Sequence, residues 1–178
     1  MNDADLDATL ARGLDARRAG DAAAARAEYT SALVACRQTD DEPRLVRALA
    51  GLAQVERDED ETAACVALYR EALGLCRGLG DPRPLAYVLR HLGDVLREAD
   101  DLEPAEPALR EAAELIRADP ETTGVGLANV LRPLALLLGA TGRPDEARPL
   151  WHEVRELYGA AGLPEGVEEA DEHLAALG

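Results

Sequence analysis

The chain has 178 residues, of which 35 are acidic and 19 are basic, and its formal net charge is −16. Such a charge opposes binding to nucleic acid or to an anionic membrane through the overall electrostatic field. Alanine and leucine dominate the composition and only 3% of residues are aromatic, which argues against a β-rich fold and favours an all-α one.

The N-terminal segment contains Asp3, Asp5 and Asp7 in place of the basic and apolar stretches of a secretory signal. The longest runs without a charged residue, 122–131 and 133–142, are half as long as the about 20 residues that a membrane-spanning helix needs. We therefore expect a cytoplasmic protein that does not bind membranes.

No spacing of residues indicates a catalytic or metal centre. Cys36, Cys65 and Cys76 lack the C-x-x-C pattern of a zinc or redox site, so we expect them to be packing residues. The three histidines have no metal-binding spacing, and the glycine motifs of nucleotide-binding loops are missing. Because all basic residues are arginine, a Walker lysine or a Schiff base is also excluded. We expect no enzymatic activity, no cofactor and no metal.

Along the chain, one pattern occurs four times. A small residue recurs at intervals of 40, 40 and 42 positions; a large residue follows it by four positions, and another small residue precedes it by twelve. These three sets are Ala25, Cys65, Ala105 and Ala147; Tyr29, Tyr69, Leu109 and Trp151; and Gly13, Ala53, Gly93 and Ala135. The constant offset predicts a repeated hairpin of two closely packed helices, whose apolar faces are buried by stacking on neighbouring hairpins.

The third copy reads Leu89-x2-Leu92-Gly93-x2-Leu96 and then Ala105-x3-Leu109. It resembles the tetratricopeptide repeat (TPR), whose pattern is W-x2-L-G-x2-Y followed by A-x3-F. The period exceeds the 34 residues of the common repeat and is similar to the extended repeats of kinesin light chains and of bacterial regulatory proteins. The resemblance covers residues 6–163 and implies a right-handed all-α solenoid that binds proteins.

We expect a single solenoid over residues 1–178, with four antiparallel helical hairpins and nine helices in all. The repeats are predicted at 6–45, 46–85, 86–127 and 128–163, followed by a C-terminal capping helix at 164–178. Within each first helix, positions 3, 4, 7, 8, 10 and 11 of the repeat form the apolar stripe. Pro133 falls inside the first helix of the fourth repeat, which we expect it to kink or delay.

Positions 2, 5, 9 and 12 of each first helix share the face that does not enter the core. The resemblance implies that this face lines a concave groove that holds a partner peptide. In the first repeat these positions are Asp7, Leu10, Leu14 and Arg17, so the lysine and asparagine clamp of co-chaperone repeats is missing. From the other repeats we select as partner-binding candidates Arg47, Gln54, Arg57, Tyr87, Arg90, Asp94, Arg97, Asn129, Arg132 and Leu136.

The sixteen positions of this face carry a formal charge of +4, whereas the remainder of the chain carries −20. An arginine strip of this kind predicts an acidic peptide or a carboxylate as the partner. The alternative is that arginine, as the chain's basic residue, collects on any solvated helix face. A second series, Arg37, Arg77 and Arg117, lies at the ends of the second helices, where it would offset the helix dipole.

Two other functions stay open at this point. One is a sensor that binds a small anion or a signalling peptide and changes shape. The other is a self-associating structural unit, with Leu136 and the apolar run 134–138 as the interface. We expect a protein or peptide partner, and a monomer or weak homodimer.

Overall fold

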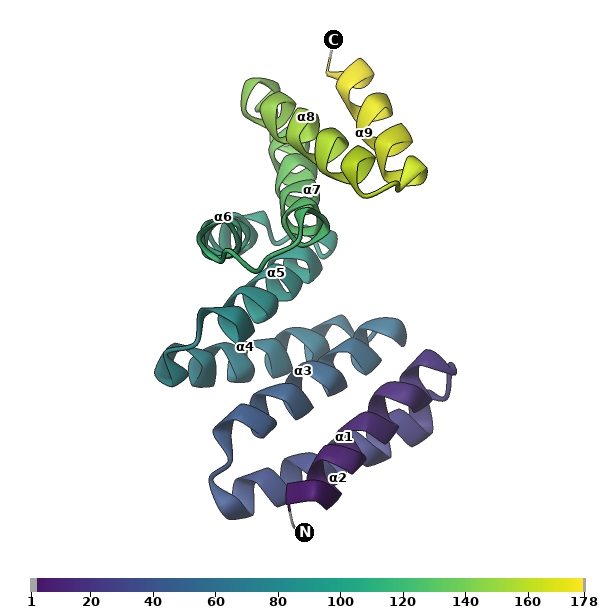
Figure 1. The fold of residues 1–178 in the computed structure, drawn as a ribbon, viewed down its shortest axis with the longest axis vertical. Coiled ribbons are helices and arrows are strands. Elements are labelled where there is room, and N and C mark those ends of the chain that lie inside the picture. Colours follow the sequence, from purple (N-terminus) through teal and green to yellow (C-terminus); the bar gives the residue numbers. More distant parts are fainter. Residues whose placement is uncertain (1–2, 178) are drawn as a thin grey trace. The chain divides into compact units, whose positions relative to one another are not determined.

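The computed structural model describes residues 3–177, which form nine α-helices and no strand (Figure 1). The helices are α1 (Asp3–Arg18), α2 (Ala22–Thr39), α3 (Glu42–Asp58), α4 (Thr62–Leu79), α5 (Pro82–Glu98), α6 (Leu102–Ala118), α7 (Gly124–Ala140), α8 (Pro144–Ala160) and α9 (Pro164–Ala176). The predicted all-α fold of helical hairpins with a C-terminal capping helix is confirmed.

The chain divides into two compact units, an N-terminal unit (Met1–Val88) and a C-terminal unit (Leu89–Gly178). In the N-terminal unit, α1 packs on α2, α2 on α3 and α3 on α4, and α1 also contacts α3. In the C-terminal unit, α6 packs on α7, α7 on α8 and α8 on α9. Most of these contacts, taken within each unit, join helices that are neighbours in the sequence, as stacked hairpins require. The single solenoid over residues 1–178, with its four repeat boundaries, stays a prediction.

The two helices of each hairpin are joined by a turn with one residue in the left-handed region. This residue is Gly20, Asp60, Asp100 or Gly142, with φ between 60° and 76°. Side chains then cap several of the following helices: the Asp21 carboxylate accepts a hydrogen bond from the Ala24 amide at 2.9 Å, and Asp41 accepts one from Arg44 at 3.1 Å.

The repeated residues form the core. Tyr29, Tyr69, Leu109 and Trp151 are each no more than 4% exposed, as are the small residues four positions before them. A Cβ on Gly93 would lie 2.6 Å from Cγ of Leu109 and 3.2 Å from the Ala105 carbonyl oxygen, which confirms the predicted close approach. Tyr29 also reaches the next hairpin, because a Cβ on Gly51 of α3 would overlap its ring. The three cysteines are buried and free, as predicted.

Two expectations about α7 were wrong. The helix begins at Gly124 and continues through Pro133 to Ala140, so Pro133 does not delay it, whereas the predicted kink stays a prediction. The run 134–138 is buried except for the partly buried Leu136, because α7 lies between α6 and α8. This run therefore cannot supply the predicted self-association surface. Within residues 3–177, none of the helices combines the length and apolar character required to span a bilayer.

Candidate functional site

The candidate face of the N-terminal unit is formed by α1, α3 and the start of α5. Leu14 and Tyr87 are exposed there, at 37% and 44%. The Asp58 carboxylate raises the pKa of Arg17, and the Tyr87 and Tyr69 hydroxyl groups add smaller electrostatic contributions. Arg17 therefore lies close to Tyr87, and Leu14 is one turn before Arg17 on the same helix face. Leu10, also predicted for this face, is buried instead.

A hydrogen-bond network joins α1 to α3 and α4 in this unit. The Arg17 guanidinium binds Asp58 through two nitrogens, at 2.6 and 3.1 Å, and donates to Oε1 of Gln54 at 3.0 Å. The Gln54 amide in turn donates to the Tyr69 hydroxyl group. Gln54 is only 6% exposed, so its predicted role as an adaptable contact to a partner was wrong. Burial raises the pKa of Tyr69, which keeps this hydroxyl group neutral.

Arg47 is the more accessible arginine of this face, with 59% of its side chain exposed. Its Nη1 lies 3.0 Å from Oδ1 of Asp7. The same carboxylate receives two bonds from Arg44, at 2.8 and 3.0 Å, and Arg44 also binds Asp41 at 2.7 Å. The bond from Arg44, and to a smaller extent that from Arg47, lowers the pKa of Asp7 to about 2. Arg57 is partly buried on the same helix.

The candidate face of the C-terminal unit is formed by α5 and α7. On α5, Arg97 binds Asp94 at 2.8 Å and Glu98 at 3.4 Å, and Arg90 lies 2.5 Å from the His91 ring. On α7, Arg132 forms a forked ion pair with Glu169 of α9, in which Nε and Nη2 are each 2.7 Å from a carboxylate oxygen. Leu136 is partly buried one turn further along α7.

Electrostatic effects show which of these groups lie together. The pKa of Arg132 is raised mainly by Glu169 and to a smaller extent by Tyr158 and Asp94. Burial raises the pKa of Tyr158, and the charges of Arg132, Glu169 and Arg90 also act on it. In the C-terminal unit, Asp94 of α5 thus acts electrostatically on Arg132 of α7, and Arg90 and Arg132 both act on Tyr158.

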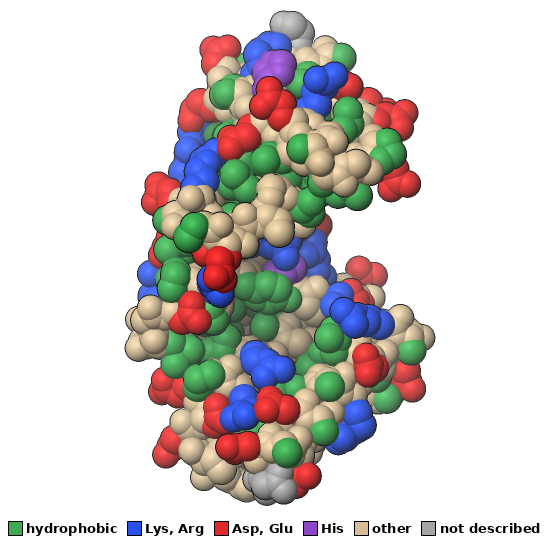
Figure 2. All heavy atoms as spheres, in the orientation of Figure 1, with side chains coloured by type: hydrophobic (Ala, Val, Ile, Leu, Met, Phe, Trp, Pro, Cys, Tyr) green, Lys and Arg blue, Asp and Glu red, His purple; other side chains and the backbone are tan. Residues whose placement is uncertain are grey.

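The arginine strip is partly neutralised by the chain itself. Arg17, Arg47, Arg97 and Arg132 each bind a carboxylate, and on the face drawn in Figure 2 arginine side chains lie beside acidic ones. Adding Asp58 and Glu169 to the strip lowers its formal charge from +4 to +2. The attraction for an acidic partner is therefore weaker than the sequence predicts.

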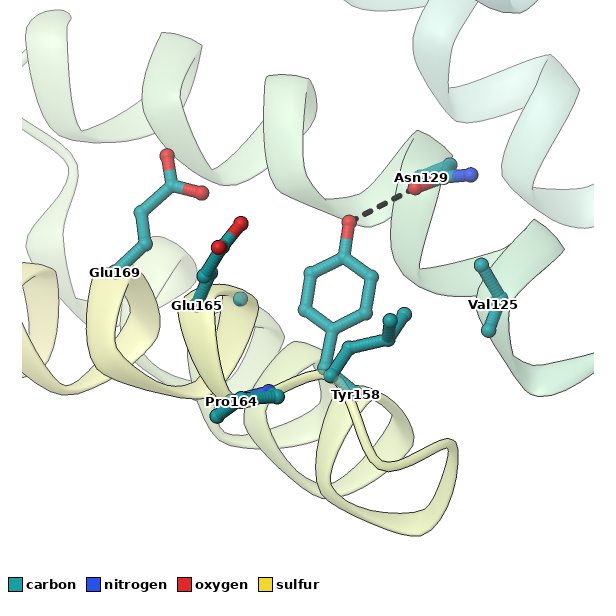
Figure 3. A pocket seen from close by; sticks show the side chains of 8 residues that line it. Val125, Asn129, Tyr158, Pro164, Glu165 and Glu169 are labelled. Atoms are coloured by element: carbon teal, nitrogen blue, oxygen red, sulfur yellow. Dashed lines mark hydrogen bonds between the residues drawn. The ribbon is translucent and has the colours of Figure 1, made fainter.

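The C-terminal unit also contains a pocket of about 510 Å³ between α7, the turn before α9, and α9 (Figure 3). Its lining residues are Val125, Asn129, Tyr158, Leu163, Pro164, Glu165, Gly166 and Glu169. The Tyr158 hydroxyl group donates to Oδ1 of the predicted site residue Asn129 at 2.8 Å. The sequence analysis did not select the other lining residues as site candidates. In the sequence, residues 163–166 indicate only the start of a helix, and Glu169 lies on the outer face of the predicted capping helix.

Two members of the second arginine series also bind carboxylates. Arg37 of α2 binds Glu71 of α4 at 2.7 Å, and Arg117 of α6 binds Glu153 of α8 at 2.5 Å. Each pair therefore links the second helices of two successive hairpins. Beyond any effect on the helix dipole, this position holds neighbouring repeats together.

Comparison with known proteins supports the predicted repeats over part of the chain. Residues 46–118 match the family model described as tetratricopeptide repeat. No protein with a curated description matches the sequence. Among solved structures, RapI in its apo form aligns with a TM-score of 0.82 and 13% identity, over 96% of this chain and 69% of RapI.

Two further solved structures are similar. BtubC (BKLC) from P. vanneervenii aligns with a TM-score of 0.71 and 19% identity, over 91% of this chain and 75% of that one. The Rap conjugation gene regulator of the plasmid pLS20, solved with the Phr* peptide, aligns with a TM-score of 0.77 and 17% identity. That alignment covers 96% of this chain and 47% of the regulator, so the present chain spans about half its length.

Proposed function

Because residues 46–118 match the tetratricopeptide repeat model, we propose that the chain is a non-catalytic module that binds a segment of a partner protein. The proposed binding surface of the N-terminal unit is the exposed face of α1, α3 and the start of α5, and that of the C-terminal unit is the exposed face of α5 and α7. Repeats of this kind present extended surfaces for other chains, and the surface needs no catalytic group.

One observation carries this proposal. Leu14 and Tyr87 are two of the four large apolar side chains that are exposed among residues 3–177, and both accompany arginines on the face of the N-terminal unit. Tyrosine and arginine are enriched in protein interfaces and in their energetic hot spots. A partner segment that covers Tyr87 and Leu14 would remove their apolar surface from water.

The charge of the partner is a weaker element of the proposal. Arg47 uses one N–H group on Asp7, so the other donors of its exposed guanidinium are available to a carboxylate of the segment. Arg17, Arg97 and Arg132 would first have to exchange Asp58, Asp94 and Glu169 for the partner. We therefore propose that one carboxylate of the partner binds Arg47. The other contacts of the interface are apolar or uncharged polar ones.

Capture of binding proteins from the native lysate tests the proposal with a matched pair of variants. Arg47→Glu combined with Tyr87→Ala changes the candidate face. Arg37→Glu combined with Val34→Ala makes the same charge reversal and also truncates an exposed apolar side chain, at residues of α2 outside the candidate face. The first variant is expected to lose a protein that the unchanged chain and the second variant both capture. Equal capture by both variants would contradict the proposal.

A sensor for a signalling peptide is the second candidate. Its support is the similarity to the Rap regulator that was solved with the Phr* peptide. A sensor would bind a short peptide without any other protein and would change shape on binding. Small-angle X-ray scattering with and without the captured segment distinguishes it from a passive module, whose scattering curve would keep its form.

A further inference from the structure

We propose that the pocket between α7 and α9, hereafter the α9 pocket, binds the side chain of an arginine or lysine residue in a partner segment. The inference rests on the proposed function, because it takes a partner segment to be the ligand. It adds a basic contact in the C-terminal unit, where the arginine strip alone would predict only acidic ones.

The walls of the α9 pocket suit the methylene part of a long basic side chain. Val125, Leu163, Pro164 and the Tyr158 ring supply apolar surface. Leu163 is 41% exposed, so the chain leaves apolar surface in water at the mouth of the pocket. Arginine and lysine side chains cover such surface with their stems while the charged head reaches a polar group.

The depth of the α9 pocket depends on Gly166. A Cβ at this position would lie 2.7 Å from Cγ and 2.9 Å from Cε2 of Tyr158, so only glycine lets the ring lie against the backbone of α9. Figure 3 shows the Tyr158 ring with the carboxylates of Glu165 and Glu169 on one side and Asn129 and Val125 on the other.

The charged head of the ligand has one carboxylate available. Glu165 and Glu169 are four residues apart and so share one face of α9. Glu169 is already bound by Arg132, whereas Glu165 is exposed and forms no ion pair within residues 3–177. The N-terminal end of a helix stabilises a negative charge, and in α9 the Glu165 carboxylate supplies this charge. The site is therefore suited to a cationic ligand and not to an anionic one. Because Arg132 binds Glu169, Glu165 is left as the partner of an incoming cation.

Asn129 can hold the backbone of the same segment. Its Oδ1 accepts the hydrogen bond from Tyr158, so the orientation of the amide is fixed and both of its N–H groups remain as donors. A carbonyl group next to the bound basic residue could accept one of them. The pocket thus combines an apolar wall, one carboxylate and one amide donor, which together select a basic residue within a peptide.

Titration of the full chain with acetyl-Ala-Arg-Ala-amide, followed by two-dimensional ¹H–¹⁵N NMR, tests the inference. We expect saturable shifts of the Val125 and Gly166 amides and of the Asn129 side-chain amide. The same peptide with citrulline, which is neutral and of the same shape, should bind about five- to tenfold more weakly, as expected for loss of one charge-assisted hydrogen bond.

Two variants complete the test. Glu165→Gln should reduce binding of the arginine peptide to the level of the citrulline peptide. Glu168→Gln removes the same charge from an exposed position of α9 outside the α9 pocket and should leave the affinity unchanged. Equal effects of the two variants, equal binding of the two peptides, or shifts confined to other residues would overturn the inference. None of these results affects capture through Tyr87, so the proposed function is tested separately.

Discussion

The indole ring of Trp151 stacks on the imidazole ring of His173, with centroids 4.3 Å apart and planes inclined by 9°. Trp151 is the chain's one tryptophan and is 1% exposed, and His173 belongs to α9. The stack therefore attaches the capping helix to α8, and tryptophan fluorescence reports directly on that attachment. The sequence indicated that Trp151 packs inward, but it gave no reason to pair it with a histidine 22 positions later.

Substitution His173→Ala should uncover one face of Trp151. We expect a red-shifted fluorescence emission and a loss of about 1 kcal/mol in the free energy of unfolding, the size typical of an aromatic pair. The matched control is His152→Ala, which removes an exposed histidine next to Trp151 in the sequence. If both variants shift the emission equally, the stack does not cover the indole ring.

Glycine at position 51 is expected to be essential for packing between the first two hairpins. A methyl group there would overlap the Tyr29 ring, so Gly51→Ala should lower the free energy of unfolding by about 1–3 kcal/mol. Gly74→Ala lies in the middle of α4, where a Cβ meets no atom within 4 Å, and should raise stability by up to about 1 kcal/mol. Urea denaturation measures both, and stabilisation by Gly51→Ala would show that Tyr29 moves aside freely.

Asp60 and Asp100 adopt the left-handed conformation, each with φ of 60°, at the turn position that glycine occupies in the other two hairpins. Glycine adopts this conformation without the Cβ penalty, so Asp60→Gly and Asp100→Gly should each stabilise the chain by roughly 0.5–1 kcal/mol. Asp101→Gly, at the adjacent residue with φ of −91°, serves as the control and should give no gain. Thermal unfolding followed by circular dichroism distinguishes these outcomes.

The ion pairs of Asp7 predict a pH dependence of stability. Arg44 lowers the pKa of Asp7 from 3.8 to about 2, so the folded state favours the charged form more strongly than the unfolded state does. The resulting stabilisation is complete above the unfolded pKa and is lost as the pH falls through the folded pKa. The difference in unfolding free energy between the natural chain and Asp7→Asn should shrink between about pH 4 and pH 2. A difference that stays constant over this range would contradict the assigned pairing.

The fold could be predicted from the sequence because small and large residues recur at regular positions of each repeat. Tyr69 and Leu109 follow a small residue by four positions and are buried, and the helix starts at Pro144 and Pro164 follow from proline at the first helical position. The helical period also places Tyr87 on the exposed face correctly.

The details of the site depend on contacts between side chains of different helices. The repeat period in the sequence does not specify these contacts. The polarity of Gln54 predicts exposure to solvent, yet the Tyr69 hydroxyl group on α4 and Arg17 on α1 satisfy its amide inside the unit. Asp58 and Glu169 do not occupy positions 2, 5, 9 or 12 of a first helix. Their ion pairs with Arg17 and Arg132 therefore could not be predicted from the repeat pattern. The α9 pocket likewise arises only when the turn before α9 meets α7.

Site-specific photo-crosslinking tests the central claim most directly, because it identifies the surface that a partner covers. A benzophenone amino acid replaces Tyr87 in one preparation and Val34, which is more exposed and lies on α2, in the other. In native lysate, we predict that position 87 forms a crosslink to a discrete protein and that position 34 does not. A crosslink of equal yield to the same protein from position 34, or none from position 87 while that protein is still captured, would contradict binding at the faces of the first helices.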